Sequence, residues 1–246
     1  MNNEKPIDVK IGVKPVFPAL IHSGVYEGPC RTGTAETLDP ERERTRSREL
    51  FSRFQKELPA HLPAEAKMLA PVYLEHGDDW IISESEYAKL ETDLEDTDLF
   101  LVDRGATLAQ FAAVKIGERY KKPVAMVGGE LDSNLPMGCD AVSHLRGRKL
   151  EAYMLLDYSE LDQLISLLRV RKAIERTRIL RVTEGKFDNV NGNFLSLANL
   201  ETRFGIGHKD ISIAEFIEEM DRVVQTKCEQ ERAQAVTDAL IGNAQQ

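Results

Sequence analysis

An apolar run typical of a buried parallel strand limits what this chain can fold into more than any other feature. Residues Asp98–Asp103 (DLFLVD) are apolar throughout their middle, as a strand covered on both faces of a sheet requires. An amphipathic helical pattern over Thr107–Tyr120 follows, and then a second apolar run, Pro123–Gly128. This order of strand, helix and strand predicts right-handed crossovers and a parallel sheet.

The same alternation of strands and helices extends in both directions along the chain. Val9–Val13 indicates a strand that breaks at Pro15, and the Asp39-Pro40 pair starts a helix that ends near Leu58. After a loop rich in Gly, Pro, Asn, Asp and Ser, further strands and helices follow, the last helix being capped by Ser212 with Glu215 at capping-box spacing. We therefore predict an α/β fold of two Rossmann-like (flavodoxin-like) units with mainly parallel sheets, near residues 1–135 and 136–246, with an incomplete second unit as an open alternative.

Composition and missing motifs exclude several classes of function. The 41 acidic and 32 basic residues give a net charge of −9, which argues against a nucleic-acid partner. No apolar stretch approaches a membrane span, and the polar N-terminus lacks the core of a secretory signal, so we expect a cytoplasmic protein with no membrane partner. The three cysteines and five histidines show no metal-binding spacing, and glycine-rich nucleotide motifs are absent from the sequence. We expect no cofactor within this chain.

Candidate ligand-binding residues gather in the segment that follows the first strand. In open α/β sheets, ligands bind at the carboxyl ends of the strands. Charged and polar side chains that could hold sugar hydroxyls or a carboxylate crowd into this segment: Lys14, His22, Tyr26, Glu27 and Arg31. The alternative is that Glu27 pairs with Arg31 and only fixes the loop.

Four further candidates lie at other predicted strand ends. Asp103 and Arg104 follow the DLFLVD strand, while Glu130 and Glu184 hold equivalent positions in the two halves of the chain. Each could contact a ligand, and either glutamate could act as a base. The alternative is that they are ordinary turn, capping and loop residues.

The N-terminal half resembles the L-fucose isomerase family and its L-arabinose isomerase relatives. Lys10–Pro15 (KIGVKP) looks like that family's opening K-I-G-[IV]-R-P strand, and Gly24–Glu27 (GVYE) resembles its G-V-R-E. The segments 98–103, 123–128 and Phe187–Ile213 resemble later parts of the family in the same order. Tyr26 stands where the family has arginine, and Leu20–Ser23 replaces a basic segment.

The resemblance implies aldose–ketose isomerisation of L-fucose-type or L-arabinose-type sugars. It would place Lys14 and Glu27 in or near a loop that reaches the sugar site, often that of a neighbouring subunit, and so favours a homo-oligomer. Family members use Mn²⁺ held by a Glu, an Asp and a His that lie downstream of the matched region. We expect that metal centre outside this chain.

Three functions stay open at this point, and whether the chain is itself an enzyme stays open with them. It could be the substrate-binding N-terminal part of a sugar ketol-isomerase-like protein, a non-catalytic sugar-binding or assembly module, or an unrelated doubly wound ligand-binding domain. A substrate-binding part of a larger isomerase predicts exposed apolar surface near Val223–Ile241, in the last helix. A self-contained module predicts that this last helix is covered within the fold.

Overall fold

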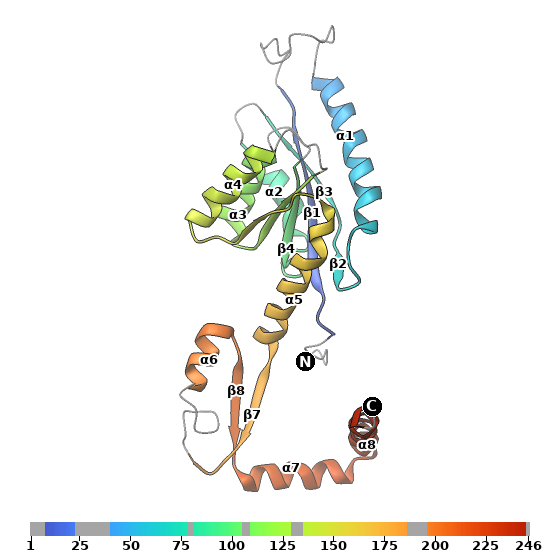
Figure 1. The fold of residues 1–246 in the computed structure, drawn as a ribbon, viewed down its shortest axis with the longest axis vertical. Coiled ribbons are helices and arrows are strands. Elements are labelled where there is room, and N and C mark those ends of the chain that lie inside the picture. Colours follow the sequence, from blue (N-terminus) through green and yellow to red (C-terminus); the bar gives the residue numbers. More distant parts are fainter. Residues whose placement is uncertain are drawn as a thin grey trace. The chain divides into compact units, whose positions relative to one another are not determined.

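The computed structural model describes residues 8–22, 40–77, 81–104, 109–128, 135–185 and 196–244. Figure 1 shows an open sheet built from strands of residues 11–154, with helices between most successive strands. None of the described helices combines the length and the apolarity needed to cross a bilayer.

The larger sheet is parallel in every described pairing. Its order is β2-β1-β4-β5-β6, and β3 also pairs with β1. The strands are β1 (Ile11–Leu20), β2 (Ala66–Met68), β3 (Val72–His76), β4 (Leu99–Asp103), β5 (Val124–Val127) and β6 (Ala152–Met154). Because β2 and β3 pair with successive halves of β1, they act as one interrupted strand, and the sheet has the 2-1-3-4-5 order of flavodoxin-like folds. The predicted α/β class with a mainly parallel sheet is confirmed.

The first strand continues past Pro15, where the sequence predicts a break. The amides of Ile11 and Ile21 both donate toward the β2 and β3 side, so odd-numbered amides of β1 face that side. Pro15 therefore lies opposite the interruption between β2 and β3. The amide side of Pro18 faces the β4 side, beyond the last β1–β4 pair at Val16 and Val102. Both prolines occupy positions where the ladder has no bond to lose, so the strand can extend to Leu20.

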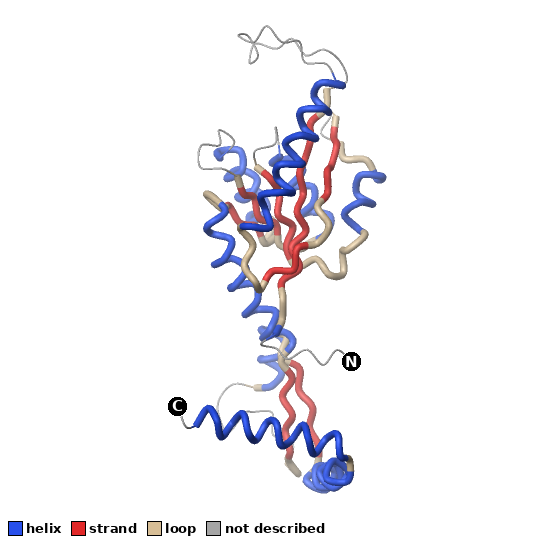
Figure 2. The backbone as a smooth tube through the Cα atoms, turned by 90° about the vertical axis from the view of Figure 1, so that its right-hand side faces the viewer, coloured by secondary structure: helices blue, strands red, loops and turns tan. Residues whose placement is uncertain are grey.

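Helices cover both faces of this sheet (Figure 2). Phe17 packs its ring against Phe51 and Phe54 of α1 (Pro40–Glu57), with ring centroids 5.9 and 6.2 Å apart. On the opposite face, Phe100 stacks on Tyr120 of α3 (Ala109–Tyr120) at 5.4 Å. The remaining helices of this region are α2 (Glu84–Glu91), α4 (Leu135–Gly147) and α5 (Leu161–Arg176), with the short 3-10 turns η3 (Leu58–Ala60) and η4 (Tyr158–Glu160).

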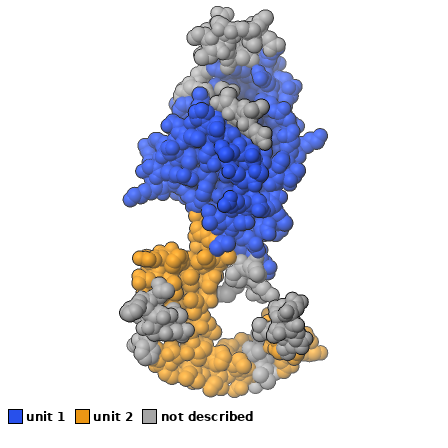
Figure 3. Space-filling model, viewed as in Figure 1, with its two compact units in different colours: residues 1–170 blue, residues 171–246 orange. Residues whose placement is uncertain are grey.

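The chain divides into two compact units, which we call unit 1 (residues 1–170) and unit 2 (residues 171–246) (Figure 3). The sequence places the boundary near residue 135. In the structure, β6 pairs with β5, and α4 buries Ala141, Val142 and Leu145 in the core of unit 1. The segment that we expected to open a second unit thus completes the first one.

Unit 2 is built on a pair of parallel strands, β7 (Arg178–Val182) and β8 (Gly207–Ile211). Its helices are α6 (Leu197–Phe204), α7 (Ile213–Gln225) and α8 (Lys227–Ala244). Ser212 caps α7 as predicted, because its hydroxyl accepts a hydrogen bond from the amide of Glu215 at 3.0 Å. Helix α6 ends at Gly205, whose φ of 71° lies in the left-handed region that glycine adopts without strain.

Candidate functional site

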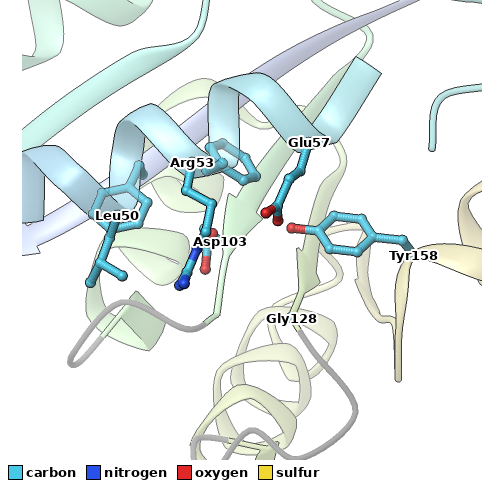
Figure 4. A pocket seen from close by; sticks show the side chains of 8 residues that line it. Leu50, Arg53, Glu57, Asp103, Gly128 and Tyr158 are labelled. Carbon is cyan, nitrogen blue, oxygen red and sulfur yellow. The ribbon is translucent and has the colours of Figure 1, made fainter. Parts of the chain in front are cut away.

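A pocket of about 290 Å³ lies beneath α1, at the carboxyl ends of the parallel strands (Figure 4). Asp103 is the last residue of β4, and Gly128 follows β5 directly. The strand order reverses between β1 and β4, and in doubly wound sheets ligands bind in the crevice at this switch point. We call this cavity the α1 pocket; its lining residues are Phe17, Leu50, Arg53, Phe54, Glu57, Asp103, Gly128 and Tyr158.

Helix α1 supplies four of the eight described lining residues through one of its faces. Leu50, Arg53, Phe54 and Glu57 follow the spacing i, i+3, i+4 and i+7, which brings their side chains to one stripe of the helix. Phe54 is buried and packs on Phe17, while Arg53 and Glu57 are exposed toward the opening of the pocket. The same helix face therefore provides both an apolar floor and charged groups.

Asp103 lies on the face of the sheet that α1 covers, and the strand register puts it there. Val16 lies opposite Val102 in the β1–β4 pair, so the next residues, Phe17 and Asp103, point to the same side of the sheet. Figure 4 shows the Arg53 side chain reaching toward Asp103, and the Tyr158 hydroxyl pointing toward Glu57. Each of the two carboxylates thus lies beside a hydrogen-bond donor, Asp103 beside Arg53 and Glu57 beside Tyr158.

The hydroxyl of Tyr158 stays protonated in this environment. Burial raises the pKa of the Tyr158 phenol above its ordinary value, and the carboxylates of Asp103 and Glu57 raise it further, while Arg104 and Arg53 oppose part of the rise. The phenol is therefore a hydrogen-bond donor at neutral pH. Its ring stacks on His61, with centroids 4.6 Å apart and planes 15° apart.

Hydrogen bonds between side chains and the backbone hold Tyr158 in place after the end of β6. Arg104 is 2 % exposed and donates hydrogen bonds from Nη1 to the carbonyl of Leu155 at 2.8 Å and from Nη2 to that of Leu156 at 3.1 Å. Asp157 then begins the η4 turn by accepting a hydrogen bond from the amide of Ser159 at 2.7 Å. These contacts fix the chain on both sides of the tyrosine.

Of the residues that the sequence proposes for ligand binding, Asp103 lines the α1 pocket. Arg104 follows it but lies buried behind the pocket, bonded to the β6 end as described above. The ammonium of Lys14 lies on the opposite face of the sheet, since Lys14 is in register with Phe100, and it pairs with Asp93 at 2.7 Å.

The other proposed residues lie away from this cavity or outside the described part of the chain. The ring of His22 lies 2.6 Å from a carboxylate oxygen of Glu43, and this contact ties the end of β1 to the first turn of α1. Glu184 belongs to unit 2, where its carboxylate accepts a hydrogen bond from the amide of Ile213 at 2.8 Å, at the start of α7. Tyr26, Glu27, Arg31 and Glu130 lie outside the described residues.

Sequence reasoning missed Arg53, Glu57 and Tyr158. A signal for the first two was present, because both share the helical spacing of the apolar residues Leu50 and Phe54. Charged side chains inside an otherwise apolar stripe indicate a polar contact at that face. Tyr158 carried no comparable signal, since its place depends on the pairing of β6 with β5 and on the contacts of Arg104 with the end of β6.

The resemblance to sugar isomerases implies Mn²⁺, so we examined the donor groups for a fitting site. Within the described ranges, no group of three or more His, Cys, Asp and Glu side chains is placed to hold a metal ion. Asp103 and Glu57 line the α1 pocket, and its other described lining residues include no third such donor. These residues do not fit the family's Glu, Asp and His centre.

The arrangement suits a small polar ligand with an apolar face. Arg53 and Tyr158 donate hydrogen bonds, Glu57 and Asp103 accept them, and Phe17 offers an aromatic surface. Compared with known proteins, the chain matches no family model and no curated protein.

Proposed function

We propose that unit 1 binds a small sugar in the α1 pocket, as the substrate-binding part of a sugar ketol-isomerase-like protein. The observation that supports the ligand class is the pairing of donors with acceptors over an aromatic floor. Sugar hydroxyls donate to carboxylates such as Glu57 and Asp103 and accept from Arg53 and Tyr158. The C–H face of a sugar ring packs against an aromatic side chain such as Phe17.

The size of the pocket favours a monosaccharide over a larger ligand. Its volume of about 290 Å³ lies at the lower end of the range of roughly 300–1,000 Å³ that small-molecule sites occupy. A dinucleotide would need more room and a glycine-rich phosphate loop after the first strand, which the sequence lacks.

Two observations support the wider context of a ketol-isomerase-like protein. The KIGVKP segment that resembles the isomerase family supplies the first half of β1, a strand of the sheet that builds the pocket, paired on both sides. Within the range Val223–Ile241, the described apolar side chain of Val236 is 59 % exposed. Such surface is what the first of the three possible functions predicts in this range. In this proposal the metal centre is supplied by a region outside the chain.

Calorimetric titration of the full chain with L-fucose, L-arabinose and their ketoses tests the proposal. We expect binding of at least one of these sugars, and we expect Glu57→Gln to weaken it about tenfold or more, because a charge-assisted hydrogen bond is lost. Tyr158→Phe should weaken it to a similar degree. Glu49→Gln is the matched control, since Glu49 is an exposed glutamate of the same helix that does not line the pocket.

Two results would contradict the proposal in different ways. Failure to bind any of the four sugars, or binding that Glu57→Gln leaves unchanged, would remove the α1 pocket as a sugar site. Each titration is repeated with Mn²⁺, and sugar binding that requires the ion would place a metal site within this chain and refute a metal centre supplied from elsewhere.

A further inference from the structure

A second concave surface lies on the opposite side of unit 1 from α1, between the two neighbouring helices α3 and α4. We call it the α3–α4 groove; its volume is about 510 Å³. Its lining includes Gln110, Phe111, Lys115, Met137, Asp140 and His144. Phe111 and Met137 are 39 % and 43 % exposed, so two large apolar side chains face solvent beside each other.

The two helices pack closely near their C-terminal ends. At Gly117, a side-chain Cβ would lie 2.8 Å from Leu145 Cδ2, so glycine permits tight packing there. Nearer the N-termini, the larger residues Phe111 and Met137 stand at the helix–helix boundary. The Gln110 amide lies 3.4 Å from the Met137 sulfur and closes the end of the groove.

Opposite charges flank this apolar surface. Lys115 lies in the second turn of α3 and Asp140 in the second turn of α4, and both are exposed. Within the described part of the chain, neither forms an ion pair with the other or with a third residue. The neighbouring His144 and Arg148 differ, because both contact Glu118.

We propose that a second copy of this chain covers the α3–α4 groove. Helices α3 and α4 run parallel, since Gln110 contacts Met137 and Gly117 lies against Leu145. A two-fold axis along the groove, parallel to both helices, would therefore set α3 of one copy parallel against α4 of the other. Lys115 and Asp140 lie at the same level of their helices. Lys115 of each copy therefore faces Asp140 of the other copy, and the pair forms twice. Phe111 and Met137 of both copies then share one buried apolar centre. The proposal does not depend on sugar binding in the α1 pocket.

The charge pattern is what favours a second copy over an unrelated partner. A surface with one cation and one anion at matching levels is complementary to itself after a two-fold rotation. A basic or an acidic partner would satisfy only one of the two charges.

Sedimentation equilibrium of the full chain with charge-reversed variants tests the interface. We expect a dimer, and we expect Lys115→Glu or Asp140→Lys alone to weaken it about tenfold or more, since each places like charges together twice. The double variant Lys115→Glu/Asp140→Lys should recover the affinity of the natural chain. An equimolar mixture of the two single variants should also recover it, because both pairs are then of opposite charge.

Lys56→Glu is the control, since Lys56 is an exposed lysine of α1 on another part of unit 1. All these substitutions are at exposed positions, and circular dichroism verifies that each variant is folded. The proposal fails if the natural chain is a monomer at about 100 μM. It also fails if the single reversals leave the dimer unchanged, or if neither the double variant nor the mixture recovers it.

Discussion

Lys14 and Asp93 form an ion pair whose two ends differ greatly in exposure. The ammonium nitrogen lies 2.7 Å from the carboxylate oxygen, and the side chain of Lys14 is 1 % exposed while that of Asp93 is 31 % exposed. Asp93 follows α2, and the register of β1 turns Lys14 away from the α1 pocket. The pair therefore stabilises unit 1 on the face opposite to the candidate sugar site.

This asymmetry predicts unequal effects of removing the two partners. Asp93→Ala leaves a buried ammonium without its counter-charge, and we expect a loss of about 3 kcal/mol in the free energy of unfolding. Lys14→Met replaces the lysine by an apolar side chain of similar length and leaves a carboxylate that water can reach, so we expect a loss of about 1 kcal/mol. Urea unfolding followed by circular dichroism measures both values. A larger loss for Lys14→Met would contradict the argument.

Arg104 should prove essential to the stability of unit 1. Its guanidinium is buried and bonds two successive carbonyls at the end of β6, so Arg104→Met would leave both carbonyls without these donors. We expect a loss of about 3 kcal/mol or more in urea unfolding. Arg104→Lys should recover little, because an ammonium cannot reproduce the two-pronged geometry.

Arg148→Met is the comparison for this prediction. Arg148, directly after α4, has a side chain that is 60 % exposed and pairs with Glu118 of α3. Exposed ion pairs contribute little, so we expect its removal to leave the unfolding midpoint almost unchanged. Equal effects of Arg104→Met and Arg148→Met would show that the carbonyl contacts of Arg104 are not stabilising.

Two glycines should respond to alanine in opposite directions. At Gly12, a Cβ would lie 1.9 Å from the backbone oxygen of Asp96, which cannot move aside without displacing the start of β4. Gly12→Ala should therefore cost about 3 kcal/mol or prevent folding. At Gly147, the last residue of α4, nothing lies within 4 Å, and Gly147→Ala should stabilise by about 0.5 kcal/mol. Thermal unfolding of the two variants side by side distinguishes these outcomes.

The sequence predicts the sheet well where the signals are local. The apolar run of β4 and the Ser212 cap of α7 are each set by neighbouring residues, and both appear as expected. The continuation of β1 beyond Pro15 was not predictable, since it depends on an interruption between two other strands. The extent of unit 1 depends likewise on which strand β6 joins, and no local pattern encodes that choice.

The candidate site was predictable only in part for the same reason. Asp103 follows a strand, and the rule that ligands bind at carboxyl ends of strands finds it from sequence alone. Arg53 and Glu57 share the helical spacing of Leu50 and Phe54, but the strand register is needed to place them over Asp103. Tyr158 reaches the pocket through contacts of the buried Arg104 with the preceding carbonyls.

The aromatic cluster under α1 makes stability fall at alkaline pH. Tyr73 stacks on Phe17 with centroids 6.2 Å apart and lies 5.5 Å from Phe51. Burial raises the pKa of the Tyr73 phenol to about 12, and the carboxylate of Glu75 contributes to the rise. Burial also raises the pKa values of Tyr158, Tyr120 and Tyr87.

The sign of the effect follows from comparing the folded and unfolded states. Below pH 10 the Tyr73 phenol is neutral in both states, and its contribution to stability is fully present. As the pH rises from about 10 to about 12, the unfolded chain loses the proton while the folded chain keeps it, so unfolding becomes more favourable. Urea unfolding at about pH 8 and about pH 11 should show lower stability at the higher value. Tyr73→Phe should reduce the difference, because phenylalanine cannot ionise in either state. A pH dependence that is identical in Tyr73→Phe and the natural chain would contradict the assignment to Tyr73. Tyrosinate absorbance of the folded protein tests the raised pKa values themselves, and a titration centred at about pH 10 for all tyrosines would contradict them.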